Sequence, residues 1–334
     1  MGRFSVRTSI LQTALSGDAS PFSPRLGRKG LLYRMWHQLV ETYSQSALTY
    51  YSDKPIAIAG LAKAFQRYLQ LDPIDYVCGN WRPNLVRELL WCCAGGKRSY
   101  DNRIPTWSWL SIDPGTVCWY LEDDFEWVET AEIVEFNVLQ TDDPFINSMS
   151  RPLVLRGAIC EITVSRNEDP CEIEYLNQES GDLWGFAMTI QVHCLSEEDG
   201  FLTKLDDDSE EFVRFATNQP LYLSLVRVAE ANSGPKASSE QRDDFSLNCG
   251  GKFECLILNK TVDDVHFRRI GYFMFDRISQ YSEQYVGPIS VRESLEKAKI
   301  SCRILERAFK NYKPTSDTHH GTLSRKYFQA VKII

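Results

Sequence analysis

The sequence predicts an α+β protein, with an N-terminal helical subdomain, then a mainly antiparallel β-rich domain, then a C-terminal helix. Three observations predict this order. Apolar residues recur at helical spacing in the first third, short β-branched and aromatic runs bounded by turn residues fill the middle, and helical spacing returns near the C-terminus. A run of helices followed by a run of strands is typical of α+β proteins rather than doubly wound parallel sheets.

The chain has 334 residues, enough for one large domain or two of ordinary size. The patterns divide it into successive segments. We expect a disordered leader over 1–29, a helical tryptophan-rich subdomain over 30–112, a β-rich domain over 113–290 with a mobile loop near 230–248, a C-terminal helix over 291–311 and a basic tail over 312–334.

Helices are expected at three places in the tryptophan-rich subdomain. The first covers 31–43, where apolar residues fall on one face. The second covers 55–71, and Ser52 or Asp53 can cap its N-terminus. The third covers 83–94, opens on a proline and ends at the following pair of glycines.

Strands are expected after this subdomain, because Val, Ile, Leu, Phe and Tyr gather there in short runs. The expected strands cover 117–121, 129–139, 153–164, 221–229, 253–259 and 269–275.

Composition argues against several classes of protein. The net charge of −8 does not favour nucleic-acid binding, and no apolar run is long enough to span a membrane. The ten cysteines form no C-x-x-C pair, and the histidines show no metal-ligand spacing. We expect reduced cysteines, no metal, no cofactor and a cytoplasmic location. The basic, Ser-bearing N-terminus leaves a mitochondrial location as the alternative.

Catalytic motifs give no positive signal. The glycine-rich phosphate loops and the serine elbow G-x-S-x-G are absent from the sequence. His193 and Cys194 are adjacent, but neighbours on a strand point to opposite faces and cannot easily act together. We therefore expect no catalytic residue.

Tryptophan is concentrated in one region, with seven of eight between Trp36 and Trp127. These indoles could line a groove of a hydrolase or carbohydrate-binding protein, with carboxylates nearby. They could instead interlock as core, because each indole buries a large area and needs one N–H partner. Burial of all four central indoles would exclude the groove: Trp81, Trp91, Trp107 and Trp109.

Several segments, taken in order, carry a family resemblance over roughly 31–280. They are Trp36-His-Gln-Leu-Val-Glu-Thr-Tyr, Asp53-Lys-Pro-Ile-Ala-Ile-Ala-Gly-Leu, Tyr76-Val-Cys-Gly-Asn-Trp, Glu88-Leu-Leu-Trp, Pro105-Thr-Trp-Ser-Trp-Leu and Phe267-Arg-Arg-Ile-Gly-Tyr. Their order and spacing resemble the region that follows the HET domain in fungal heterokaryon-incompatibility proteins. The Pro-x-Trp-Ser-Trp segment behind Gly-x-Trp and Leu-Leu-Trp is the most specific part.

The resemblance implies a role in self/non-self recognition and cell-death signalling. The HET domain, related in architecture to TIR-type signalling domains, would precede Trp36. Only 35 residues do so here, and they lack the HET signature. The chain therefore resembles the post-HET region alone, as a shortened paralogue, a fragmentary gene model or a stand-alone protein.

The resemblance assigns no catalytic residue, and we expect its signature positions to be structural. They are Trp36, Tyr43, Asp53, Gly60, Gly79, Trp81, Leu89, Leu90, Trp91, Pro105, Trp107, Ser108, Trp109, Arg268, Arg269 and Gly271.

Specific roles can be predicted for some signature positions. The segment after Pro105 should be extended, so that two indoles share one face and the serine between them points away. Gly60 should let a neighbouring element approach the second helix. Arg268-Arg269 should pair with Asp113 or Glu88.

The expected function is therefore that of a non-enzymatic regulatory or interaction region of a HET-type protein. We expect it to bind a protein partner through an exposed apolar patch, and a HET-domain protein in trans is the candidate. A cryptic hydrolase or carbohydrate-binding protein and an inert truncated paralogue are the alternatives.

Overall fold

The computed structural model describes most of the chain between residues 27 and 334. The described residues are 27–46, 50–99, 104–120, 126–136, 143, 145, 152–165, 173–176, 185–191, 201–230, 252–263, 265–276 and 328–334. The chain forms two compact units. Unit 1 comprises Met1–Asp124 and Asn137–Pro152, and unit 2 comprises Phe125–Phe136 and Leu153–Ile334.

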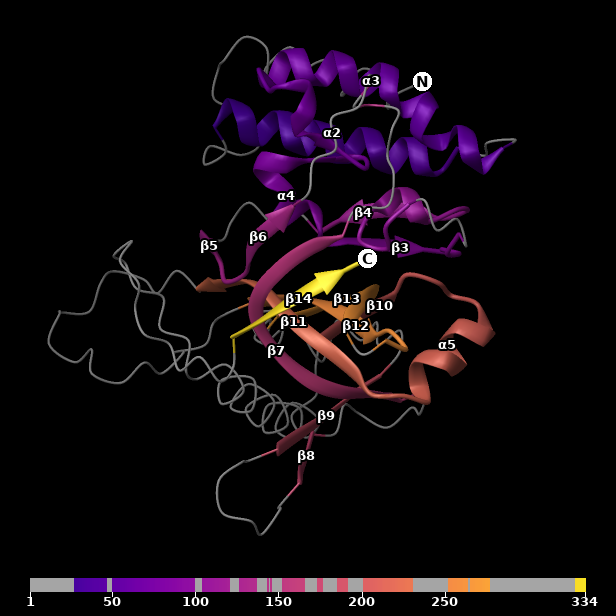
Figure 1. Cartoon of the computed structure of the whole chain (residues 1–334), viewed down its shortest axis with the longest axis vertical. Coiled ribbons are helices and arrows are strands. Elements are labelled where there is room, and N and C mark those ends of the chain that lie inside the picture. Colours follow the sequence, from indigo (N-terminus) through magenta and orange to yellow (C-terminus); the bar gives the residue numbers. More distant parts are fainter. Residues whose placement is uncertain are drawn as a thin grey trace, which may run out of the picture. The chain divides into compact units, whose positions relative to one another are not determined.

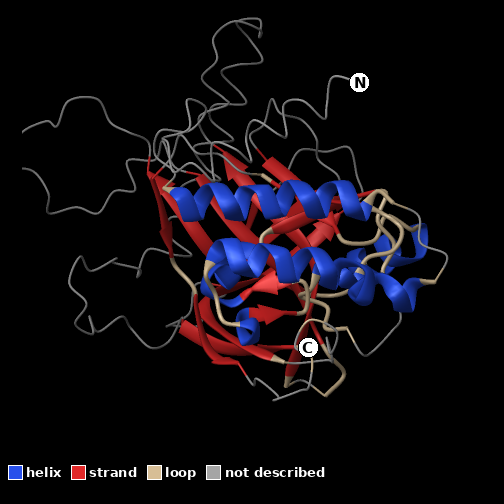
Figure 2. Cartoon of the chain, turned by 90° about the horizontal axis from the view of Figure 1, so that it is seen from above, coloured by secondary structure: helices blue, strands red, loops and turns tan. Residues whose placement is uncertain are grey.

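The α+β class is confirmed, with an N-terminal helical region and sheets that are mainly antiparallel. Helices α2 (Arg28–Ser44) and α3 (Lys54–Leu69) confirm the first two expected helices within a few residues at each end. The two helices run side by side in unit 1, as Figures 1 and 2 show.

The expected cap at Asp53 is wrong. The short 3-10 helix η1 (Tyr51–Asp53) runs directly into α3, so Asp53 already has helical φ and ψ of −83° and −11°. A capping side chain needs an extended backbone at the cap position. The Asp53 side chain accordingly makes no cap hydrogen bond, and α3 begins instead with Lys54 and Pro55 in its first turn.

The third expected helix, over 83–94, is also wrong. The chain forms the 3-10 helix η3 (Arg82–Asn84) and a single turn, α4 (Leu85–Glu88), and then enters strand β3 (Trp91–Ala94). Strand β3 pairs antiparallel with β4 (Thr116–Trp119). Trp and Cys are poor helix formers, and this long-range pairing outweighs the helical spacing of the apolar residues.

The same pairing moves the domain boundary. The β-rich domain was expected to begin at 113, but β4 belongs to unit 1, which continues to Asp124. The remaining elements of unit 1 are short: η2 (Pro73–Asp75), β1 (Tyr76–Val77) paired antiparallel with β2 (Asn80–Trp81), and η4 (Trp109–Ser111).

Unit 2 is built on one large sheet. Its elements are β5 (Glu126–Glu129), β6 (Glu132–Phe136), β7 (Leu153–Ser165), β8 (Ile173–Leu176), β9 (Gly185–Gln191), β10 (Phe201–Leu205), α5 (Glu210–Thr217), β11 (Leu221–Glu230), β12 (Lys252–Lys260), β13 (His266–Asp276) and β14 (Phe328–Ile333).

The strands of this sheet pair in the order β5-β11-β12-β13-β14-β7-β9-β8. β10 pairs with β13 and β6 pairs with β7. Because β7 also pairs with β11, the path β11-β12-β13-β14-β7 returns to its start and these strands close on themselves. The curvature of β7 is visible in Figure 1. The β13–β14 and β7–β9 pairs are parallel, and the other pairs are antiparallel.

The expected strands of unit 2 are present with shifted ends, except that the run over 129–139 is divided. Thr130 and Ala131 both donate their backbone N–H to Val226 O and separate β5 from β6. The basic tail expected over 312–334 carried no predicted element, but its end forms β14. There Val331 and Ile333 are buried while Ala330 and Lys332 are exposed, because a strand between β13 and β7 needs one apolar face.

Other predictions fall on residues that the structure does not describe. These are the first 26 residues of the leader, all but residue 230 of the expected mobile loop and the whole C-terminal helix over 291–311. The expected leader nevertheless reaches too far, because α2 begins at Arg28.

Candidate functional site

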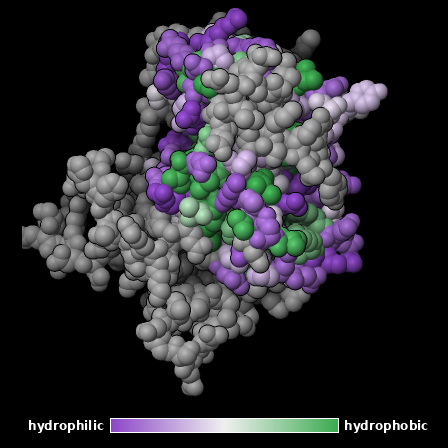
Figure 3. Space-filling view, viewed as in Figure 1, coloured by the Kyte–Doolittle hydropathy of each residue, from purple (hydrophilic) through white to green (hydrophobic). Residues whose placement is uncertain are grey.

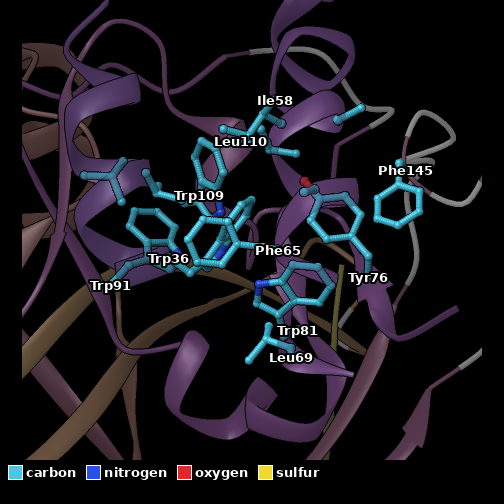
Figure 4. Packing of buried hydrophobic residues seen from close by; sticks show 14 of the residues in the cluster. Trp36, Ile58, Phe65, Leu69, Tyr76, Trp81, Trp91, Trp109, Leu110 and Phe145 are labelled. Carbon is cyan, nitrogen blue, oxygen red and sulfur yellow. The ribbon is translucent and has the colours of Figure 1, made fainter. Parts of the chain in front are cut away.

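The central indoles form the core of unit 1. Trp36, Trp81, Trp91, Trp107 and Trp109 each have 0% of their surface exposed. Figure 4 shows several of them packed against the apolar faces of α2 and α3. The hypothesis of a tryptophan-lined sugar or hydrolase groove is therefore wrong, because none of these ring faces is available for stacking.

Two of these indoles meet at one backbone carbonyl. Trp36 Nε1 donates to Gly79 O at 3.3 Å and Trp109 Nε1 donates to the same oxygen at 2.8 Å. Gly79 has a φ of +85°, and a Cβ added there would lie 2.7 Å from Trp109 Nε1. Both the backbone conformation and the space require glycine at this position.

The segment after Pro105 is a turn, not the expected extended strand. Ser108 N donates to Pro105 O at 3.0 Å, and η4 follows directly. The physical reason is that proline restricts the residue before it, here Ile104, and leaves Thr106 free to enter the turn.

Ser108 is 0% exposed, and its hydroxyl is held inside unit 1 instead of pointing away. Its Oγ donates to Cys78 O at 2.6 Å and accepts from Leu110 N at 3.1 Å. Trp91 Nε1 donates to Trp107 O at 3.0 Å, which ties the same segment to β3. The signature residues Leu89, Leu90 and Pro105 are buried as well.

A buried lysine lies beside Trp109. Lys54 is 2% exposed, its Nζ donates to Ile112 O, and Nζ lies 5.6 Å from the centre of the Trp109 ring. Burial lowers the pKa of Lys54 to about 8, although the nearby Asp113 acts in the opposite direction. Tyr43 completes the group, because its hydroxyl donates to Lys54 O at 2.8 Å.

The predicted pairing of Arg268-Arg269 with Asp113 or Glu88 is wrong. Arg269 forms a buried ion pair with Asp206, with Nη2 to Oδ1 at 3.1 Å and side chains 0% and 1% exposed, while Arg268 is exposed. The expected partners Asp113 and Glu88 belong to unit 1, whereas both members of the observed pair belong to unit 2. Strand β10 leads into Asp206 and pairs with β13, which brings the two side chains together.

Gly271 allows this strand pairing. It lies opposite Leu205, and an added Cβ would lie 2.6 Å from Lys204 O. The backbone of β10 therefore approaches β13 at a distance that only glycine permits.

Sequence reasoning missed one buried polar cluster in unit 1. His37 Nε2 lies 3.0 Å from Glu88 Oε1, and Asn84 Nδ2 donates to that oxygen at 2.9 Å. The His37 ring stacks on Trp119 with centroids 4.2 Å apart. The residue pattern carries no signal for it, because His37 sits next to Trp36 on a helix face otherwise expected to be apolar. A His–carboxylate pair can act as a general base. Here the two side chains are 4% and 0% exposed, so the pair lacks an open face for a substrate.

The outer face of α3 is apolar and exposed. Ala57, Leu61, Ala64 and Tyr68 follow one another at intervals of four, three and four residues, which places them in one row along the helix. All four are exposed, Leu61 to 44% and Tyr68 to 43%. Such a row is normally buried against a partner.

The neighbouring row of α3 contains Ile56, 54% exposed, and Gly60. The close approach expected at Gly60 is wrong, because an added Cβ there would have nothing within 4 Å. We define the outer face of α3 by its six exposed apolar positions: Ile56, Ala57, Gly60, Leu61, Ala64 and Tyr68.

Large apolar side chains are also exposed at single positions in unit 2, including Val134 and Phe215 at 41% and 43%. Figure 3 shows one face of the molecule, on which hydrophobic residues in green are interspersed with hydrophilic ones in purple. What distinguishes the outer face of α3 is its regular helical spacing over about three turns, from Ile56 to Tyr68.

Comparison with protein-family models, with curated proteins and with solved structures finds no match to this chain. In the part of the chain that the structure describes, His, Cys, Asp and Glu side chains form no group of three that could hold a metal ion. None of the helices described is long and apolar enough to cross a membrane.

Proposed function

We propose that this chain is a non-enzymatic interaction region of a HET-type incompatibility protein, and that it binds a HET-domain protein in trans through the outer face of α3. The observation that carries the proposal is the exposed apolar row of Ala57, Leu61, Ala64 and Tyr68. The choice of partner rests on the resemblance of the signature segments to the post-HET region.

The spacing of this row suits a helical partner. A helix lays side chains at such intervals into an apolar groove or along a second helix. The small residues Ala57, Gly60 and Ala64 would let a partner backbone come close, while Leu61 and Tyr68 supply apolar area. Arg67 lies beside the face and is exposed, so an acidic group on the partner would complement it. Lys63 is exposed too, but it already pairs with Asp143, with Nζ to Oδ2 at 2.7 Å.

The side of α3 that faces the core of unit 1 holds the helix in place without the outer residues. Ile58, Ala62, Phe65 and Leu69 are buried in the core of unit 1, so the outer residues are not needed to hold the helix in place. A helix with apolar residues on both its inner and its outer side is typically buried on both sides, here by the core of unit 1 and by the proposed partner.

The test is a pull-down from fungal extract with the full chain as bait, in which captured HET-domain proteins are quantified by mass spectrometry. We expect the Leu61→Lys/Tyr68→Lys variant to capture at least tenfold less HET-domain protein than the wild type. The Trp107 and Trp109 side chains are unsuitable for this purpose, because they are core residues and their replacement would unfold unit 1.

The matched control is Val134→Lys/Phe215→Lys, which changes two side chains of similar exposure in unit 2. It should capture as much HET-domain protein as the wild type. Equal capture by the α3 variant and the wild type, or no HET-domain protein on wild-type bait, would contradict the proposal. An inert remnant would instead be insoluble or bind no protein specifically.

A further inference from the structure

Two cysteines of unit 1 face each other across the small sheet. Cys92 on β3 and Cys118 on β4 are directly opposite in the antiparallel register. Their Sγ atoms lie 3.2 Å apart, and the Cys92 thiol also lies 3.6 Å from Cys118 O. Both are thiols in the structure.

These two side chains lie on the face of the sheet turned away from the indole core. Trp91, Cys93 and Val117 belong to the core of unit 1, and Trp119 packs against that core. Because side chains alternate along a strand, Cys92 and Cys118 point to the opposite face. Cys118 is partly exposed whereas Cys92 is 2% exposed, so a small oxidant can reach the pair from Cys118.

We propose that Cys92 and Cys118 form a reversible disulfide when the protein meets a peroxide. The Cys118 thiolate attacks a peroxide oxygen and becomes a sulfenic acid, and the O–O bond breaks with release of hydroxide, which becomes water on protonation. The Cys92 sulfur then attacks Cys118 Sγ. The S–S bond forms, the S–O bond breaks, and the sulfenic oxygen leaves as a second water. Two thiols are oxidised and one peroxide is reduced.

The backbone is already in place for this bond. Directly opposed residues in an antiparallel pair have Cα atoms about 4.5 to 5.5 Å apart, within the range of about 4.4 to 6.8 Å seen in disulfides. Rotation of the two side chains about χ1 brings the sulfur atoms together without moving a strand. The pair would then work as a modification site, one that reductants of a cell restore to two thiols.

The disulfide would close a loop that contains the Pro105-Thr-Trp-Ser-Trp segment. The loop from Cys92 to Cys118 spans 26 residues and contains Pro105, Ser108 and both neighbouring indoles. Closing a loop of this length restricts the unfolded chain, so oxidation should raise the Tm of unit 1 by roughly 5 to 10 °C.

The test treats the full-length chain with a small excess of hydrogen peroxide, blocks remaining thiols with N-ethylmaleimide and maps peptides without reduction. We expect the tryptic peptides 88–97 and 104–156 to be joined, and to separate after dithiothreitol. Cys93 lies in the first peptide, so a Cys93→Ser variant assigns the bond to Cys92.

Cys255→Ser, which changes a buried thiol of unit 2, should form the same linked peptide as the wild type. Cys118→Ser should show no rise in Tm on oxidation. Full alkylation of Cys92 and Cys118 after peroxide treatment, or a bond from Cys118 to Cys93, would overturn the proposal. Should the serine variant at 118 not fold, the linked peptide in the wild type and in Cys93→Ser still decides the question.

Discussion

Trp36 and Trp109 donate their indole N–H groups to one backbone oxygen, that of Gly79, at 3.3 and 2.8 Å. This shared acceptor joins α2 to η4 in the core of unit 1. Gly79 itself has a φ of +85°, in the left-handed region that favours glycine.

Gly79→Ala should therefore destabilise unit 1 strongly. The new Cβ would lie 2.7 Å from Trp109 Nε1. The alanine would also have to adopt the left-handed backbone conformation of residue 79. Strain and overpacking together should lower the free energy of unfolding by about 3 kcal/mol. Urea denaturation followed by tryptophan fluorescence measures this loss. A change below about 1 kcal/mol would show that the shared acceptor does not order the core.

Gly60→Ala is the opposite case on α3. Gly60 is an exposed helical residue, and an added Cβ would have nothing within 4 Å. Alanine has the higher helix propensity, so the free energy of unfolding should rise by about 0.5 to 1 kcal/mol. The same denaturation experiment measures the gain. A loss of stability would mean that something contacts this glycine in solution.

Asp206→Ala should cost about 3 to 5 kcal/mol, because it leaves the fully buried Arg269 guanidinium without its carboxylate. Arg269→Leu should cost a similar amount for the converse reason. The double variant should lose less than the sum of the two single losses, by about 1 to 3 kcal/mol. A double-mutant cycle from urea denaturation measures this coupling, and strict additivity would refute it.

Lys54 should make stability depend on pH. Its folded pKa of about 8 lies below the ordinary value of 10.5, so between these values the unfolded chain binds more protons and stability rises with pH. The gain should approach about 1 kcal/mol per pH unit from pH 8 to 10. Above pH 10 the raised pKa values of Tyr33 and Tyr43, about 12 each, act in the opposite sense.

Lys54→Met provides the comparison. The stability difference between wild type and variant, from urea denaturation at pH 7, 8, 9 and 10, should shift in favour of the wild type as pH rises. Parallel curves for the two proteins would show that the Lys54 ammonium is solvated in the folded state.

The sequence was informative wherever a local pattern coincides with the final environment. Helices α2 and α3 and strands β7, β11, β12 and β13 carry enough periodic apolar residues to be recognised individually. Core packing of the indoles was also one of the two interpretations that the sequence offered, because each indole buries a large area and needs only one partner for its N–H group.

The sequence predicted an exposed apolar patch but not which element carries it. An apolar docking patch was expected from the resemblance to the post-HET region, but α3 is apolar on nearly every side. Only the packing of Ile58, Phe65 and Leu69 into the core leaves Leu61 and Tyr68 outside. Helical spacing alone cannot say which of two apolar rows is buried, because both satisfy the same period.

What the sequence determined by itself is thus the α+β order, the main helices and strands and the composition of the core. Only the tertiary structure decided that Trp91–Ala94 is a strand, that the chain end forms β14, that Arg269 pairs with Asp206, and that Cys92 faces Cys118. Each of these depends on a partner distant in the chain. Such a pairing forms only when the fold brings the distant partner into contact, and no local pattern of residues encodes where that partner lies.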